Sequence, residues 1–390
     1  MRTFYKWMGR SLLTIIITLA IIYVWKSDEI SRLYSVVTLY DEDKIVANFS
    51  NMNLAFPHKE VNRGSGPVSI LEAGPQIQSS EALTRWTQER SVTALVILKD
   101  GALVHESYYQ GTKETDRRMS FSVAKSFLSA LLGVVVEEGY IAALNDPVIK
   151  YAKSLQGTAY DKSSILNVLQ MSSGVTFDED YSAFNSDINR MSRNLALGGS
   201  MDVFAESLKE TFTKPGSQWK YVSIDTHVLG MVIRGATGRD IPSLLSEKII
   251  RPLGLEQSPY YIVDGTGVAF VLGGLNLSTR DYARFGQMFL QNGSFNGLQV
   301  VPAQWVAEST QASANTERGK INYGYQWWIP TDAAEGEFLG RGIYGQYLYV
   351  NRPRGIVIAC NASDMKFREN GVHAKYVEMF RKIAENTLAD

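Results

Sequence analysis

Ser122 and Lys125 are the residues whose types and spacing are best suited to chemistry. They lie three positions apart in "MSFSVAKSFLSALLGVVVEEG", residues 119–139, where a long apolar run begins. A buried ammonium is expensive, so this lysine is either an accident at a helix end or a functional group. Residues i and i+3 share a helical face, which lets the Lys125 amine reach the Ser122 hydroxyl. The pair indicates nucleophilic catalysis, with Ser122 as nucleophile and Lys125 as its general base.

A position at the start of a helix adds to this chemistry. The first N–H groups of a helix have no intrahelical partner, and the helix dipole favours negative charge there. The N–H of Ser122 is therefore available to a developing oxyanion. Desolvation lowers the pKa of a buried lysine toward neutrality, which a general base needs. The alternative is a first-turn lysine whose long side chain reaches solvent.

The Ser-x-x-Lys spacing occurs three times, and context separates the three pairs. Ser217 and Lys220 follow a Pro-Gly turn, whereas Ser363 and Lys366 lie in the polar stretch "SDMKFREN". Only the first pair opens a long apolar helix. Neither the G-x-S-x-G motif of another class of serine hydrolase nor a phosphate-binding glycine loop occurs in the sequence. The first pair therefore has no rival as a catalytic motif.

Composition excludes several other classes of protein. The chain has 390 residues, 45% of them hydrophobic and 20% charged, with a formal charge of −1. The sequence has no excess of basic residues, so nothing in its charge suggests a nucleic-acid partner. A single cysteine, Cys360, leaves no internal disulfide and no thiolate-rich metal site, and the four histidines lack the H-x-x-x-H spacing of zinc ligands. We predict neither a metal nor a cofactor.

The strand and helix patterns indicate how the pair is positioned. "SVTALVILKDGALVHESYYQG" reads as two strands around Asp100-Gly101, and "QYLYVNRPRGIVIACNAS" as two more strands around a Pro-Arg-Gly turn. An amphipathic helix, "NGVHAKYVEMFRKIAENTLA", follows the second pair. The middle of the chain, about residues 126–270, has mainly helical patterning. This order predicts an α/β fold with an antiparallel sheet from both chain ends, flanked by helices, and an inserted mainly helical subdomain.

The N-terminus predicts a membrane anchor over residues 1–28. Arg2, Lys6 and Arg10 precede an apolar stretch from Leu12 to Trp25. These charges favour a cytoplasmic N-terminus, with the body exported to the periplasmic side. The alternatives are a cleaved signal peptide, although no A-x-A-like site follows, and a buried core helix. Residues 29–84 are expected to form a connecting arm packed on a hydrolase domain over residues 85–390.

Several ordered motifs between about residues 85 and 385 support a resemblance to a known family. "SFSVAKSF" resembles the Ser-x-x-Lys motif of serine β-lactamases and penicillin-binding proteins. "LQMSSGVTFDEDYSAFNSDI", "PGSQWKYVSIDTHVLGMVIRGATG", "GGLNLSTRDYARFGQMFLQNG" and "YGYQWW" are similar to stretches of the class C-like branch, which includes 6-aminohexanoate-dimer hydrolases and esterases. The resemblance implies the β-lactamase/transpeptidase-like fold.

The resemblance also implies roles for particular residues. Ser122 would be acylated and Lys125 would be its base, while Tyr221, as a phenolate or a hydrogen-bonded phenol, would relay a proton to the leaving group. Ser223 would line the site, and Tyr181 matches a tyrosine that touches the substrate amide. From the residues alone, Tyr221 reads first as a core aromatic before the helix at 226–234, and Tyr181 could equally be an ordinary loop tyrosine.

The chain departs from β-lactamases at the third motif. No Lys-Thr-Gly triplet occurs, and the best placement is Gly340-Arg341-Gly342 in "EFLGRGIYGQYLYVN". Glycine then replaces the lysine that would meet a β-lactam carboxylate, and Arg341 is either a substrate contact or a solvated charge at a strand end. The N–H of Ile343 can still serve as the second oxyanion donor, because a backbone group needs no particular side chain.

These patterns predict a membrane-anchored serine hydrolase that cleaves a small-molecule amide or ester through an acyl-enzyme on Ser122. Two other function classes stay open. One is a non-catalytic envelope protein that keeps the fold to bind a ligand or partner. The other is a cell-wall peptidase acting on D-Ala-D-Ala ends, which the missing Lys-Thr-Gly disfavours.

Overall fold

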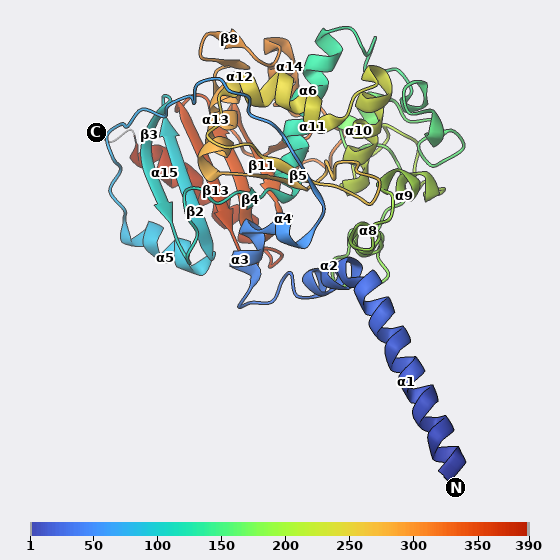
Figure 1. Cartoon of the computed structure of the whole chain (residues 1–390). Helices are drawn as coiled ribbons and strands as arrows, with labels where there is room; N and C mark the ends of the chain where they lie inside the picture. Colours follow the sequence, from blue (N-terminus) through green and yellow to red (C-terminus); the bar gives the residue numbers. More distant parts are fainter. Residues whose placement is uncertain (1, 388–390) are drawn as a thin grey trace.

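A computed structural model describes residues 2–387 of the chain, apart from a few side chains near the N-terminus. The side chain of Arg2, one of the three basic residues ahead of the apolar stretch, lies outside the described part. Figure 1 shows a layered body from which one long helix, α1 (Arg2–Trp25), projects. The polypeptide enters the body through α2 (Ser27–Val37), which lies at the base of α1.

The centre of the body is a seven-stranded antiparallel sheet in the order β3-β2-β13-β12-β11-β10-β9. The first two strands come from the N-terminal half of the chain and the other five from its C-terminal part, so both ends of the body build one sheet. The strands are β2 (Val92–Lys99), β3 (Ala102–Tyr108), β9 (Asn322–Tyr323), β10 (Trp328–Ile329), β11 (Glu337–Gly342), β12 (Gln346–Asn351) and β13 (Ile356–Ala362).

Two tight hairpins form the core of this sheet, and both were predicted by the sequence. β2 and β3 are joined at Asp100 and Gly101, which both have left-handed φ angles of 50° and 89°. This is the conformation that an Asp-Gly hairpin turn adopts. β12 and β13 pair from Asn351 and Ile356 outward, across the Pro-Arg-Gly turn. Both predicted hairpins are confirmed.

Helices cover both faces of the sheet. α15 (Val372–Asn386) and α5 (Glu81–Glu89) pack on one face, with Phe380 and Trp86 among the buried side chains. α13 (Thr279–Leu290) and α6 (Ala124–Glu137) lie on the other face, where Phe127 and Phe285 stack with ring centroids 3.6 Å apart. The closing helix predicted by the sequence is α15. The face covered by α6 is the one that carries the Ser-x-x-Lys pair.

The described chain from residue 121 to residue 253 holds only helices and isolated bridges. It lies beside the sheet, on the side of α6 (Figure 1). Its elements after α6 are η2 (Val148–Lys150), η3 (Lys153–Leu155), α7 (Ile165–Leu169), α8 (Asp187–Ala196), α9 (Met201–Ser207), α10 (Ser223–Thr237), α11 (Ile241–Leu245), η4 (Ser246–Ile250) and α12 (Arg251–Leu253).

A smaller, four-stranded sheet has the order β1-β5-β6-β4, and its strand β4 directly precedes the segment that contains Ser122. Its strands are β1 (His58–Glu60), β4 (Arg118–Met119), β5 (Tyr260–Ile262) and β6 (Leu275–Leu277). Four further short elements lie in the C-terminal half: β7 (Ser294–Phe295), β8 (Leu298–Gln299), α14 (Ala303–Ser309) and η5 (Ile343–Gly345).

The segment after α2 packs against the body. α3 (Ile45–Ser50) buries Ile45 and Phe49, and α4 (Met52–Ala55) buries Met52. β1 then pairs with β5 of the small sheet. The polypeptide that links α1 to the sheet therefore contributes to the main hydrophobic core, which includes these three side chains.

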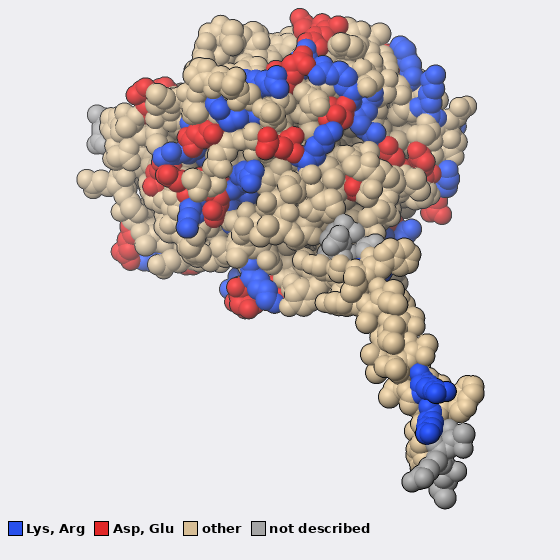
Figure 2. All heavy atoms as spheres, viewed as in Figure 1, with Lys and Arg blue, Asp and Glu red and all other residues tan. Residues whose placement is uncertain are grey.

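α1 does not contribute to that core. Its stretch Phe4–Trp25 has a mean hydropathy of 1.8, and none of it is buried. Length and composition allow it to be a membrane anchor or a signal sequence, whereas the core helix of a soluble body would be buried. Figure 2 shows α1 with basic side chains near its N-terminal end, where Lys6 and Arg10 lie, and with uncharged side chains along the rest of its visible length.

Candidate active site

Ser122 lies where the small sheet meets α6. It is the middle residue of η1 (Phe121–Val123), which follows β4 and leads into α6. The Ser120 N–H donates to the carbonyl of Leu275 in β6, which ties the start of η1 to the small sheet. Phe121 has a left-handed φ of 44°, a conformation that a bulky residue holds only under constraint. The backbone thus turns sharply just before Ser122, whose side chain stays half-exposed.

Lys125 lies one turn further, in a fully enclosed position. Its side chain is 1% exposed, so the alternative in which it reaches solvent is wrong. Burial lowers the pKa of Lys125 to about 7. The amine donates to the carbonyl oxygens of Leu272 and Ser223, at 2.8 Å and 3.5 Å. A neutral amine has two N–H donors, so these two bonds leave its lone pair free to accept a proton.

Tyr221 is the side chain that hydrogen-bonds Ser122. It precedes α10, and its ring stacks on Trp328 of β10 with centroids 5.3 Å apart. Burial raises the pKa of Tyr221 far above its usual value, which favours the hydrogen-bonded phenol over the phenolate. The Lys125 amine lies 5.6 Å from the centre of the same ring. Serine, lysine and tyrosine therefore meet in one place, as the motifs suggested.

Two carboxyl groups lie near these three residues, and the sequence analysis missed both. Glu179 accepts hydrogen bonds from the backbone N–H of Ser223 at 2.5 Å and from its hydroxyl at 3.1 Å. Asp225 is fully buried and accepts a bond from the Tyr160 hydroxyl at 2.7 Å. Burial raises the pKa of Asp225 to about 8 and also raises that of Glu179. An acid inside the apolar helix "YVSIDTHVLGMVI" was the signal that could have revealed Asp225.

Both carboxyl groups act on the lysine through space. In their ionised forms they raise the pKa of Lys125 and so oppose the effect of its burial. Desolvation is the larger influence, and the pKa remains well below that of a solvated lysine. The base strength of Lys125 therefore depends on Glu179 and Asp225 as well as on the apolar wall of α6.

Tyr181 and Ser223 line the same site. Tyr181 lies between Glu179 and α8, and its hydroxyl hydrogen-bonds Ser223. Burial raises the pKa of Tyr181 well above its usual value, so it is a neutral phenol beside Ser223. The guanidinium of Arg368 lies 5.6 Å from the centre of its ring. Tyr181 is therefore packed into the wall of the site rather than exposed on a loop.

The end of β11 packs closely against Ser120 and Phe121, just before Ser122, because Gly342 has no side chain. A Cβ atom at Gly342 would lie 2.7 Å from the carbonyl oxygen of Ser120 and 3.1 Å from the Cβ of Phe121. Ile343 follows directly, at the start of η5. The Gln346 side chain donates to the carbonyls of Ala362 and Tyr344, which holds this turn in place. The predicted oxyanion donor thus belongs to a turn that is packed against the Ser122 segment.

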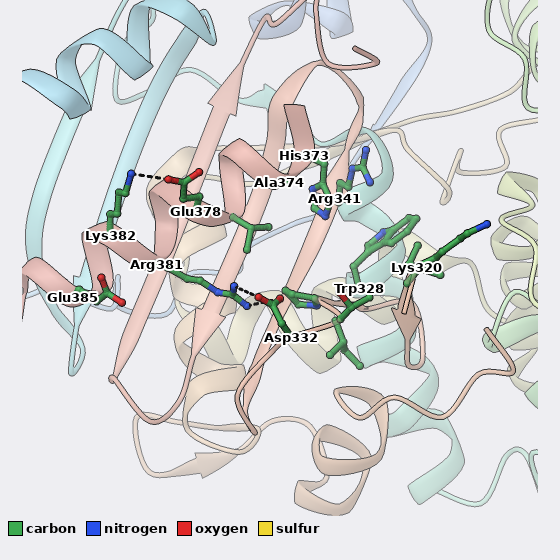
Figure 3. Close-up of a pocket in the computed structure, with 15 residues that line it drawn as sticks. Lys320, Trp328, Asp332, Arg341, His373, Ala374, Glu378, Arg381, Lys382 and Glu385 are labelled. Atoms are coloured by element: carbon green, nitrogen blue, oxygen red, sulfur yellow. Dashed lines mark hydrogen bonds and ion pairs between the residues drawn. The ribbon is translucent and has the colours of Figure 1, made fainter. Parts of the chain in front are cut away.

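Arg341 points away from Gly342, because successive side chains in a strand face opposite sides. Its guanidinium lies 5.3 Å from the ring centre of Trp328, on the face of the sheet covered by α15. There it lines a cavity of about 650 Å³ together with Trp328 and His373 (Figure 3). Arg341 thus lines a different cavity from the Ser122 cluster, although Trp328 contacts both Arg341 and Tyr221 and the charge of Arg341 lowers the pKa of Tyr221.

The antiparallel sheet, the flanking helices and the Ser-x-x-Lys helix start together define a β-lactamase-fold serine hydrolase of the amidohydrolase and esterase kind. The sequence model of the family described as Beta-lactamase matches residues 77–378. The chain belongs to this family. The predicted β-lactamase/transpeptidase-like fold and the predicted hydrolase class are thereby confirmed.

Individual relatives agree with this assignment. The 6-aminohexanoate-dimer hydrolase of Paenarthrobacter ureafaciens is 30% identical over 279 residues, which cover 68% of this chain and 70% of the relative. A Bacillus anthracis structure, provisionally named a 6-aminohexanoate-dimer hydrolase, is 25% identical with a TM-score of 0.80, covering 90% of this chain and 96% of that one. A D-stereospecific amidohydrolase from Streptomyces sp. shares the fold at 21% identity and a TM-score of 0.58, over 73% and 94% of the two chains.

Proposed function

We propose that this protein cleaves a small-molecule amide or ester through an acyl-enzyme on Ser122. The observation that carries the proposal is the meeting of three groups: Ser122 hydrogen-bonded to Tyr221, beside Lys125, whose pKa is lowered to about 7. A purely binding protein would gain nothing from burying an amine at a nucleophilic serine. Each of the three groups has a protonation state that suits a step of acyl transfer near neutral pH.

The proposed steps follow from these states. The neutral Lys125 amine accepts the Ser122 proton as the serine oxygen attacks the substrate carbonyl. The Tyr221 phenol gives its proton to the leaving nitrogen or oxygen as that bond breaks, and the proton on Lys125 replaces it. In the second half of the reaction, water attacks the acyl-enzyme. The same groups transfer protons in the reverse direction, and the acid is released from Ser122. The N–H groups of Ser122 and Ile343 are the proposed oxyanion donors.

Mass spectrometry of the intact protein tests the acyl-enzyme directly. The protein is mixed with short esters, small amides and penicillins and then quenched in acid. We expect the mass of one acyl group on Ser122 with at least one ester or amide. No adduct and no product with any member of the panel would favour the non-catalytic alternative, and an adduct with D-Ala-D-Ala peptides alone would favour the peptidase.

Substrate preference gives a second prediction. Gly340 replaces the lysine that holds a β-lactam carboxylate, and Arg341 faces the cavity on the α15 side. Loss of a charge-assisted hydrogen bond forfeits about 1.5–3 kcal/mol, or roughly 10- to 150-fold in discrimination. We therefore expect kcat/KM to be higher for p-nitrophenyl butyrate than for the cephalosporin nitrocefin.

The variant Arg341→Ala is the control for that comparison. Because Arg341 points away from Gly342, its loss should leave the preference for the ester unchanged. If the wild type prefers nitrocefin and Arg341→Ala abolishes that preference, Arg341 has taken over the role of the missing lysine and the prediction is wrong.

We also propose that α1 anchors the protein in the cytoplasmic membrane with the hydrolase domain on the periplasmic side. The support is the unburied apolar length of Phe4–Trp25 and the basic residues Lys6 and Arg10 ahead of its most apolar part. Alkaline phosphatase fused to the C-terminus should be active, since it folds only after export. An inactive phosphatase fusion, together with an active fusion to a reporter that works only in the cytoplasm, would contradict this topology.

A further inference from the structure

α2 carries an apolar stripe that the body does not cover. Its members recur at the spacing of one helical face, and 42% to 71% of each side chain is exposed. On the other side of the segment, Val36 and Leu39 pack into the main core. α2 is therefore seated on the body with an unpartnered apolar face. The α2 stripe consists of Ile30, Leu33, Tyr34 and Val37.

Neighbouring elements extend this apolar face. α2 contacts α4 and α8. α4 exposes 80% of Leu54, and Phe184, just ahead of α8, is 73% exposed. Scattered exposed apolar residues are ordinary, but a helical stripe with apolar neighbours marks an interaction surface.

The position of the α2 stripe identifies its partner as a lipid bilayer. It begins five residues after Trp25, where the unburied apolar helix α1 ends. Lys26 and Trp25 lie between the two, and aromatic and basic side chains prefer the level of the lipid headgroups. A helix that follows a membrane span and exposes one apolar face has the pattern of a helix lying in the interface.

The catalytic site is adjacent to this segment. Tyr40, three residues beyond the α2 stripe, stacks on Tyr344 with ring centroids 4.9 Å apart and an interplanar angle of 16°. Tyr344 follows Ile343, the proposed oxyanion donor, and holds a left-handed φ of 58°. Phe49 packs on Tyr344 and on Phe121, at 5.5 Å and 5.0 Å. Rings of the segment that follows α2 thus touch the residues next to both proposed oxyanion donors.

A second segment of the site also leads to α2. The loop with Glu179 and Tyr181 runs directly into α8, which contacts α2. We propose that the α2 stripe lies in the bilayer interface and presents the Ser122 site to amides or esters carried by membrane amphiphiles. The apolar chain of such a substrate stays in the lipid while its scissile bond, at headgroup level, enters the site. This inference rests on the proposed hydrolase function.

A matched pair of substrates separates the two proposals. The full chain is reconstituted in vesicles of phosphatidylcholine and phosphatidylglycerol and given the butyrate ester of 7-hydroxycoumarin with either a 4-methyl or a 4-heptadecyl group. The two esters share one scissile bond, but only the heptadecyl ester partitions into lipid. In the double variant Leu33→Glu/Val37→Glu, we expect kcat/KM for the heptadecyl ester to fall about ten-fold or more, with the methyl ester within two-fold of wild type.

The double variant Ile70→Glu/Leu298→Glu is the control. Both residues are exposed and apolar, and they lie by the β7–β8 hairpin, which Figure 1 places at the far end of the body from α1. It should behave as wild type with both esters. Equal losses on both esters, or on neither, in the α2 variant would overturn the membrane inference. Failure of the wild type to cleave the methyl ester would instead overturn the proposed hydrolase function.

Lipid contact can also be measured without activity. Cys360 is buried, so a bimane probe on Leu33→Cys reports that position alone. Brominated phosphatidylcholine should quench this probe strongly and a probe on Leu298→Cys weakly. A Leu33→Cys probe that brominated lipid does not quench would mean that water or a protein partner covers the α2 stripe, and the inference would fail.

Discussion

Replacing Ser122 with alanine should abolish hydrolysis. Ser122 is the serine that combines a partly exposed position, a hydrogen bond to Tyr221 and a place one turn before Lys125. Without its oxygen no acyl-enzyme forms, and kcat should fall by a factor on the order of 10⁶, the scale seen when the nucleophile of a serine hydrolase is removed. The measurement is steady-state hydrolysis of p-nitrophenyl butyrate, together with labelling by a fluorophosphonate.

The control for Ser122→Ala is Ser217→Ala, which removes the serine of another Ser-x-x-Lys pair. Lys220 of that pair donates to the carbonyl of Phe177, so it has a structural partner. We expect Ser217→Ala to keep wild-type labelling and activity, and Ser122→Ala to lose both. Labelling that persists in Ser122→Ala, at Ser217 or at Ser363, would refute the assignment of the nucleophile.

Replacing Lys125 should give the second largest loss. Lys125→Ala removes the amine that takes the serine proton, and loss of a general base costs about 10²- to 10⁴-fold in rate. Lys125→Arg should not restore activity, because a guanidinium stays protonated at neutral pH. Pre-steady-state release of p-nitrophenol measures the acylation step. An active Lys125→Arg variant would mean that this residue acts through its charge, and thermal unfolding of both variants shows whether they remain folded.

The pH dependence follows from the lowered pKa of Lys125. Only the neutral amine accepts a proton, so kcat/KM should rise with pH through about 7 and then level off. Glu179 is the carboxyl group with the larger effect in raising this pKa. Glu179→Gln should therefore move the rise to lower pH. A rise that stays in place, or moves to higher pH, would contradict Lys125 as the titrating base.

Local patterns in the sequence were sufficient for the two hairpins of the central sheet and for the proposed catalytic pair. The Asp100-Gly101 turn encodes its own hairpin, because that dipeptide favours left-handed φ angles. The unbroken apolar run after Lys125 predicts a helix with no solvated face, and hence a desolvated amine. Both conclusions depend only on residues that are near neighbours along the chain.

The role of Glu179 was beyond such reasoning. Glu179 lies in the polar run "FDEDYSAF", where nothing in the spacing separates it from the acids beside it. In the fold it is the acid that meets the Ser223 backbone N–H, because the loop before α8 passes the start of α10 there. Tyr40 and Phe49 were equally hidden, since they belong to a weakly periodic segment that reaches the site only through packing.

The sequence by itself determined the pairing of Ser122 with Lys125, our proposed nucleophile and base, and the helix that carries them, because a three-residue spacing on one helix turn is a local property. Only the tertiary structure decided what surrounds them. Tyr221 meets Ser122 through the docking of α10 against α6, and the register of β11 turns Gly342 toward Ser122 and Arg341 toward the α15 face. The pKa of Lys125 is likewise a tertiary property, since desolvation is the sum of all the groups that exclude water from one amine.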